Sequence, residues 1–104
     1  MILAGDFNYP TGSPRMEPIT SLPDVVDLLP PGTRTTLRET GLGFVSSYDH
    51  IFVDRLHTQE ATGQAGAYDF VAGLGYSDNE TARSDLSDHL PVWAEFRIDG
   101  PDDD

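Results

Sequence analysis

The spacing of apolar residues in the first third of the chain predicts a strand, a loop and a helix. Met1–Ala4 is an apolar run that stops at Gly5, which is typical of a short buried strand feeding a polar loop. Three prolines and a glycine in residues 9–18 predict a loop. A helical stripe follows an N-cap at Ser21 and ends at residues 30–32; its apolar positions are Leu22, Val25, Val26 and Leu29.

Most of the rest of the chain has the pattern of short strands. β-Branched and aromatic residues predict a strand over Tyr48–Asp54, the small residues of 61–67 predict a loop, and 68–71 predicts another short strand. Ser77 and Glu80 fit a capping box, which predicts a helix over 78–84. Residues 90–98 alternate as a half-buried strand, with Val92, Ala94, Phe96 and Ile98 on one face and Trp93, Glu95 and Arg97 on the other.

The mixed order of these elements predicts an α/β or α+β layered fold. A chain of 104 residues suits one domain. The absence of cysteine excludes a disulfide scaffold, a cysteine-ligated zinc site and thiol catalysis. No apolar run approaches the roughly 18 residues of a membrane span, and no targeting segment is recognisable, so the compartment stays open.

Charge changes this picture, because the formal net charge is -12 and all six basic residues are arginines. Such a balance argues against a broad basic surface that grips a phosphate backbone. It leaves room for a local site in which bound cations offset the acidic charge. The acidic end, residues 101–104, is expected to be a solvated tail.

Three polar clusters lie where predicted strands meet loops. They are Gly-Asp-Phe-Asn at 5–8, Tyr-Asp-His-Ile-Phe at 48–52 and Ser-Asp-His-Leu-Pro-Val at 87–92. Each alone also suits an ordinary surface turn with side-chain hydrogen bonds. Together they offer carboxylates for proton transfer and for a hard cation, and imidazoles that can stabilise negative charge. This is the set of groups that phosphodiester hydrolysis needs.

The same three motifs, in this order, resemble the C-terminal half of the endonuclease/exonuclease/phosphatase superfamily, nearest to deoxyribonuclease I-like nucleases. Residues 28–30, the Thr-Thr pair at 35–36 and the segment 68–82 add to the likeness. The resemblance implies an α/β fold, the C-terminal half of a four-layer sandwich, with one mixed, mostly antiparallel sheet flanked by helices. It makes residues 1–100 a partial domain without its N-terminal half.

The resemblance also implies roles for the matching residues in a metal-dependent DNA endonuclease. Asp6 would activate or orient the attacking water, and Asn8 would hold a phosphate oxygen or that water. Asp49 would orient His89, which would stabilise the transition state or act as an acid. Asp88 would bind Mg²⁺ or Mn²⁺, with Ca²⁺ as a further option. Supporting positions are Ser87, Tyr48 and His50.

Two departures keep other interpretations open. Deoxyribonuclease I-like enzymes usually carry arginine where this chain has His50, and the first half of the family's site has no counterpart here. A phosphatase or phospholipase of the same superfamily is therefore an alternative, as is a non-catalytic remnant or interaction module. The expected partners are DNA or another phosphodiester, and either an N-terminal half or a second copy of the chain. A serine hydrolase using Ser87 is disfavoured, because no Gly-x-Ser-x-Gly elbow occurs.

Overall fold

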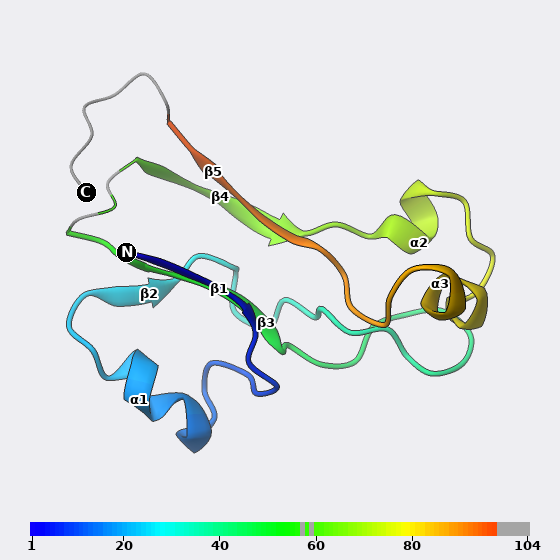
Figure 1. Cartoon of the computed structure of the whole chain (residues 1–104), viewed down its shortest axis with the longest axis horizontal. Coiled ribbons are helices and arrows are strands. Elements are labelled where there is room, and N and C mark those ends of the chain that lie inside the picture. The colour runs from blue at the N-terminus through cyan, green and yellow to red at the C-terminus, as the bar shows by residue number, and fades with distance from the viewer. Residues whose placement is uncertain (57, 59, 98–104) are drawn as a thin grey trace.

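The computed structural model describes residues 1–56, 58 and 60–97. Short strands and short helices follow one another along this part of the chain (Figure 1). In chain order they are β1 (Ile2–Asp6), the 3-10 helix η1 (Pro14–Met16), α1 (Glu17–Thr20), β2 (Val25–Asp27), β3 (Asp49–Asp54), β4 (Ala61–Ala67), α2 (Phe70–Gly73), α3 (Asn79–Asp85) and β5 (Val92–Phe96).

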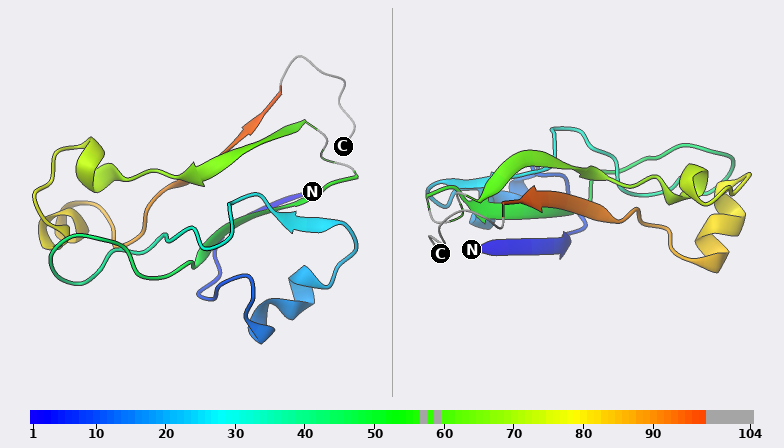
Figure 2. Two further views of the ribbon diagram at one scale, coloured as in Figure 1. Left: turned by 180° about the vertical axis from the view of Figure 1, so that it is seen from behind. Right: turned by 90° about the horizontal axis from the view of Figure 1, so that it is seen from above.

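The strands form two antiparallel sheets. The first has the order β1-β3-β2, and its register places Asp6 of β1 directly opposite Asp49 of β3. The second pairs β4 with β5, with a register shift between Ala61 and Ala65. The molecule is a slab with extents of 43 × 35 × 18 Å, and its thin dimension is visible from above (Figure 2).

Two groups of buried side chains hold these parts together. Around the central strand, Phe52 and Val53 are almost fully buried. At the other end of the slab, α2 and α3 pack on the segments that precede β3 and β5; this cluster is Leu37, Phe70, Val71, Ala82 and Leu90. The second cluster fixes the segment from which His89 projects.

The helix predicted over 22–29 is wrong. Residues 25–27 form β2 and pair with residues 52–54 of β3, while helical turns occur earlier, inside the predicted loop 9–18 and just beyond it. Asp24 has a left-handed φ of 61°, which interrupts a helix at that point. The β-branched Val25 and Val26 also suit a strand, so tertiary pairing overrides the helical spacing.

Two further predictions in the second half are wrong. The predicted loop 61–67 is β4, whose small residues extend because β5 supplies hydrogen-bonding partners. The predicted strand 68–71 is largely α2, whose N-cap Asp69 accepts a hydrogen bond from the Ala72 N–H. The helix over 78–84 is confirmed, but its N-cap is Asp78, which accepts from the Thr81 N–H, and not Ser77.

The expected mixture of helices and strands is confirmed, but one mixed sheet flanked by helices is not. The described residues form two antiparallel sheets, and α2 and α3 lie beyond the ends of the strands (Figure 1). The predicted strands at 48–54 and 90–98 are confirmed as β3 and β5, and β5 alternates as expected. The first strand is present, but it is an edge strand whose five residues are all exposed, and not the buried strand expected.

Some predictions fall outside the described residues: the place of Ile98 on β5 and the acidic tail at 101–104. None of the helices in the described segments is long and apolar enough to cross a membrane.

Candidate functional site

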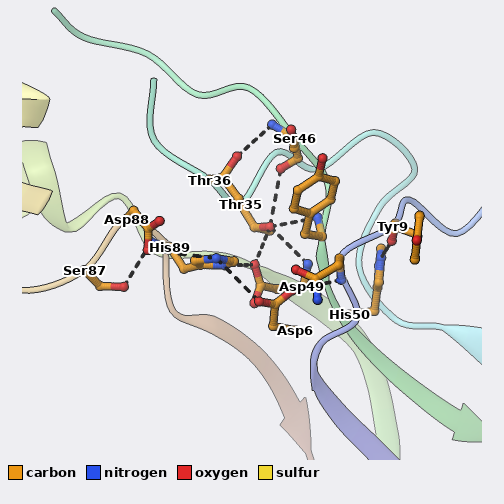
Figure 3. A network of polar contacts seen from close by, with 12 residues as sticks. Asp6, Tyr9, Thr35, Thr36, Ser46, Asp49, His50, Ser87, Asp88 and His89 are labelled. Atoms are coloured by element: carbon orange, nitrogen blue, oxygen red, sulfur yellow. Dashed lines mark hydrogen bonds and ion pairs between the residues drawn. The ribbon is translucent and has the colours of Figure 1, made fainter. Parts of the chain in front are cut away.

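Three segments far apart in the sequence bring their polar side chains together in the middle of the slab (Figure 3). Asp6 ends β1, Asp49 begins β3 on the neighbouring strand, and His89 lies just before β5. His89 is held there by an isolated bridge to Thr36. The pairing of β1 with β3 thus brings the first two motifs together. The bridge between Thr36 and His89 holds the third motif beside them.

Asp49 orients the imidazole of His89. Its Oδ2 lies 2.7 Å from His89 Nδ1, and the carboxylate is 8% exposed. An ionised carboxylate only accepts, so His89 Nδ1 carries the proton of this hydrogen bond. The other ring nitrogen, Nε2, is thereby aimed away from Asp49. The contact that the sequence predicted across 40 positions is present in the structure.

Thr35 completes this arrangement from behind. Its hydroxyl donates to Asp49 Oδ2 at 2.6 Å and accepts the backbone N–H groups of Tyr48 and Asp49, both at 3.1 Å. Thr35 is fully buried, so these partners satisfy its hydroxyl without water. Sequence reasoning noted the Thr-Thr pair only as part of a resemblance and gave Thr35 no role in the site.

The exposed side of the imidazole faces two more carboxylates. His89 Nε2 lies 3.5 Å from Asp6 Oδ2 and 4.0 Å from Asp88 Oδ1. Partial burial lowers the pKa of His89, but the hydrogen bond to Asp49 and the charges of Asp49, Asp6 and Asp88 outweigh it. The net effect raises the pKa of His89 above 6.5. The site therefore favours an imidazolium with an accessible Nε2–H.

The donor atoms fit a hard divalent cation that keeps part of its water shell. Asp6, Asp49 and His89 each offer one ligand atom, and these atoms lie within 4.8 Å of one another. An imidazolium has no lone pair for a metal, and Asp49 Oδ2 is already committed to Thr35 and His89, whereas the side chain of Asp88 is 62% exposed. Carboxylate oxygens of Asp6 and Asp88 are thus the accessible ligands, and Mg²⁺ is commonly held by one or two carboxylates plus waters.

Asn8 and Ser87 lie at turns beside the cluster. Asn8 adopts a left-handed φ of 63°, a conformation that asparagine tolerates, and its N–H donates to Asp6 Oδ1 at 2.9 Å. The Ser87 hydroxyl accepts the backbone N–H of His89 at 3.0 Å. The recorded contact of Ser87 is therefore with the backbone of His89 and not with its ring. Asn8 and Ser87 shape the two turns that carry Asp6 and His89.

Tyr48 and His50 flank Asp49 in different ways. The Tyr48 carbonyl accepts the N–H of Phe7, which ties β3 to the turn that follows β1. His50 is 3% exposed and bonds to Asp27 and to the Tyr9 carbonyl, away from the Asp6–Asp49–His89 cluster. The structure therefore brings Asp6, Asp49, Asp88 and His89 together and places His50 in a separate network.

Comparison with known proteins gives one point of reference. Over 100 residues the chain is 35% identical to a protein named deoxyribonuclease from Thioalkalivibrio sp. (strain K90mix). The match covers 91% of this chain and 27% of that protein, so the chain spans about a quarter of the length of the curated relative it matches. No protein-family model matches the chain, and no solved structure matches it.

Proposed function

We propose that this chain carries the catalytic centre of a metal-dependent phosphodiester hydrolase whose substrate is DNA. The observation that carries the proposal is the convergence of Asp6, Asp49 and His89, with the Asp49 Oδ2 to His89 Nδ1 hydrogen bond at 2.7 Å. The similarity to a protein named deoxyribonuclease supports DNA as the substrate. The residue roles below are those that the superfamily resemblance implies.

Each residue has a distinct task in the proposed reaction. Asp6 accepts a proton from the attacking water, whose oxygen forms a bond to phosphorus while the ester P–O bond breaks and the leaving alkoxide takes a proton from solvent. His89, charged and oriented by Asp49, donates an Nε2–H hydrogen bond to a non-bridging phosphate oxygen as negative charge develops there. Asn8 holds the phosphate or the water by its side-chain amide.

Asp88 is the proposed metal ligand, assisted by the carboxylate of Asp6. These residues would hold a divalent cation that, when bound, would neutralise charge at the phosphate and offset the acidic surroundings. Mg²⁺ and Mn²⁺ fit this oxygen-rich site best, and Ca²⁺ accepts the same ligands. Asp88→Asn should therefore raise the Mg²⁺ concentration needed for half-maximal cleavage, whereas Glu95→Gln on exposed β5 removes the same charge without this effect.

A second candidate function is a phosphatase or phospholipase of the same superfamily. The observation that favours it is the net charge of -12, which repels a DNA backbone. The third alternative is a non-catalytic module that keeps the geometry without turnover.

One panel of substrates separates these candidates. The purified chain is incubated with supercoiled DNA, an inositol phosphate, sphingomyelin and a small nitrophenyl phosphodiester, each with Mg²⁺ or Mn²⁺. Our proposal predicts DNA nicking and slow diester cleavage, both lost in His89→Ala. Release of phosphate or phosphocholine without nicking selects the second candidate. No turnover of any substrate by a folded sample selects the non-catalytic module.

A further inference from the structure

A second aspartate–histidine pair lies beside the proposed catalytic pair and is more deeply buried. His50 on β3 is 3% exposed, and its Nδ1 lies 2.8 Å from Asp27 Oδ2 on β2. Its Nε2 lies 2.7 Å from the carbonyl oxygen of Tyr9, in the loop after β1. The proposed reaction uses neither residue, so the burial of two ionisable groups here needs its own explanation.

The hydrogen-bond partners of His50 fix the orientation of its ring. The Tyr9 carbonyl can only accept, so His50 Nε2 carries a proton and donates to it. His50 Nδ1 lies 2.8 Å from Asp27 Oδ2 and 3.2 Å from the Thr11 hydroxyl. That hydroxyl donates to Asp27 Oδ2 at 2.7 Å, and Asp27 Oδ1 accepts the Leu29 N–H at 3.0 Å. These contacts join β2, β3 and the loop after β1 in one buried network.

The His50 ring contacts both sides of the turn that carries Asn8. The centroid of the His50 ring lies 5.9 Å from that of Phe7 and 5.5 Å from that of Phe52. The carbonyl of Tyr9, on the far side of Asn8, accepts a hydrogen bond from His50 Nε2–H. Asn8, in its left-handed conformation, is therefore fixed between two neighbours that both rest on one ring.

We propose that His50, hydrogen-bonded to Asp27 and to the Tyr9 carbonyl, is a positioning residue that sets the Asp6–Asn8 turn for the reaction. The reaction itself rests on the proposed function, whereas the contacts of His50 with the turn do not depend on it. His50 touches no reacting group; it acts through Phe7 and Tyr9. The Asp27–His50 pair thus holds the Asn8 turn in place, just as the hydrogen bond from His89 to Asp49 holds the catalytic imidazole in one orientation.

The charged groups around His50 are consistent with this role. Asp27 approaches from β2, and Asp49, next to His50 on β3, points to the opposite face and is committed to His89. Asp6 on β1 lies across from Asp49 and faces His89 Nε2. Among these groups, Asp27 is the carboxylate with a recorded contact to the His50 ring.

The test combines a spectroscopic signature with loop exchange and kinetics on the full chain. Asp27→Asn changes the partner of His50 Nδ1 with little change of shape, and His50→Gln keeps an amide donor but removes the ring. Asp24→Asn is the matched control, because it removes an exposed carboxylate three residues away at a left-handed φ that asparagine accepts. Ring ¹H–¹⁵N spectra report the hydrogen-bonded Nε2–H of His50, and amide hydrogen exchange over residues 7–12 reports the turn.

We expect the His50 Nε2–H of the wild type to be hydrogen-bonded and protected from exchange, because it faces the Tyr9 carbonyl at 2.7 Å in a buried site. Asp27→Asn and His50→Gln should speed exchange over residues 7–12 and lower kcat for DNA nicking by about tenfold or more. KM should change far less than kcat, and Asp24→Asn should behave as the wild type.

A His50 Nε2–H that exchanges as fast as that of an exposed histidine would overturn the proposal. Exchange over residues 7–12 that is equal in Asp27→Asn and Asp24→Asn would overturn it as well. If no form of the chain nicks DNA, the proposed function fails, while the ring spectra and the exchange rates still decide whether His50 holds the turn.

Discussion

At the scale of single residues, one oxygen atom organises the site. Asp49 Oδ2 receives both the Thr35 hydroxyl and the Nδ1–H of His89, so the imidazole has one orientation. Two aspartate–histidine pairs of unequal burial therefore lie side by side: His89 is partly exposed and faces Asp6, and His50 is buried and faces Asp27. Exposure separates the proposed chemical role from the proposed positioning role.

Removing the charge of Asp49 should change the titration of His89. The folded pKa of His89 is raised above 6.5, so the stabilisation it contributes is complete below pH 6.5 and is lost as pH rises through the folded pKa. Asp49→Asn should shift the ring titration to lower pH, measured by NMR without metal. The upper pH limit of cleavage should move down with it. An unchanged titration would mean that Asp49 does not act on the ring.

Thr35 should be important for stability as well as geometry. Thr35→Val leaves the N–H groups of Tyr48 and Asp49 without their acceptor, at about 1–3 kcal/mol for each group left unsatisfied. Thr35→Ser keeps the hydroxyl and loses a methyl group, which costs about 1 kcal/mol. Urea unfolding of both variants measures the difference; equal losses would contradict the role of the hydroxyl.

The residue scale also shows what sequence can and cannot predict. Local motifs and the family resemblance point to Asp6, Asp49, Asp88 and His89, and the structure brings these residues together. The role of Thr35 depends on a buried hydroxyl 14 positions from Asp49, and no local pattern marks that distance. His50 belongs to one of the three motifs, yet its partner Asp27 lies in a segment that the sequence predicts to be a helix.

At the scale of elements, short segments take their structure from their neighbours. β2 has three residues, too few to be stable alone, and β4 consists mainly of alanine and glycine, which have a low strand preference. Each is extended because it pairs with a longer or more apolar strand, β3 or β5. The strands that the sequence predicts, β1, β3 and β5, are the ones marked by an apolar run or by alternation.

Helix α3 is fastened to the rest of the chain by its first residue. The fully buried Asn79 donates from Nδ2 to the carbonyls of Arg38 and Gly43, at 3.1 and 2.9 Å. Asn79→Ala should lower the free energy of unfolding by about 1–3 kcal/mol, since the hydrogen bonds from the buried amide to two carbonyls are lost. Ser84→Ala on the exposed side of α3 is the control in the same urea experiment. A loss no greater than the control's would contradict this anchoring.

At the scale of the whole molecule, the chain is strongly acidic and less compact than a typical domain of its length. The net charge is -12, and the radius of gyration is 15.2 Å, against about 13 Å for a compact domain of this size. The apolar side chains of Ile2 and Leu3 on β1 are 53% and 40% exposed. The site itself adds three carboxylates within a few ångströms of one imidazole.

Salt should therefore stabilise the fold. Raising NaCl from about 0.1 M to about 1 M shortens the screening length from about 10 Å to about 3 Å, which weakens repulsion among the acidic groups. The urea midpoint of unfolding should rise, and Glu95→Gln should reduce the size of this rise slightly. A midpoint that falls with added salt would show that attractive ion pairs outweigh the repulsion.

The measurement that tests the central claim most directly is the nicking of supercoiled DNA in Mg²⁺ by the wild type, His89→Ala and the control Glu95→Gln. If Asp6, Asp49 and His89 form a hydrolytic centre, the wild type and Glu95→Gln nick at similar rates, and His89→Ala is slower by about 10²-fold or more. Equal nicking by all three proteins, or none by a folded wild type, would contradict the account.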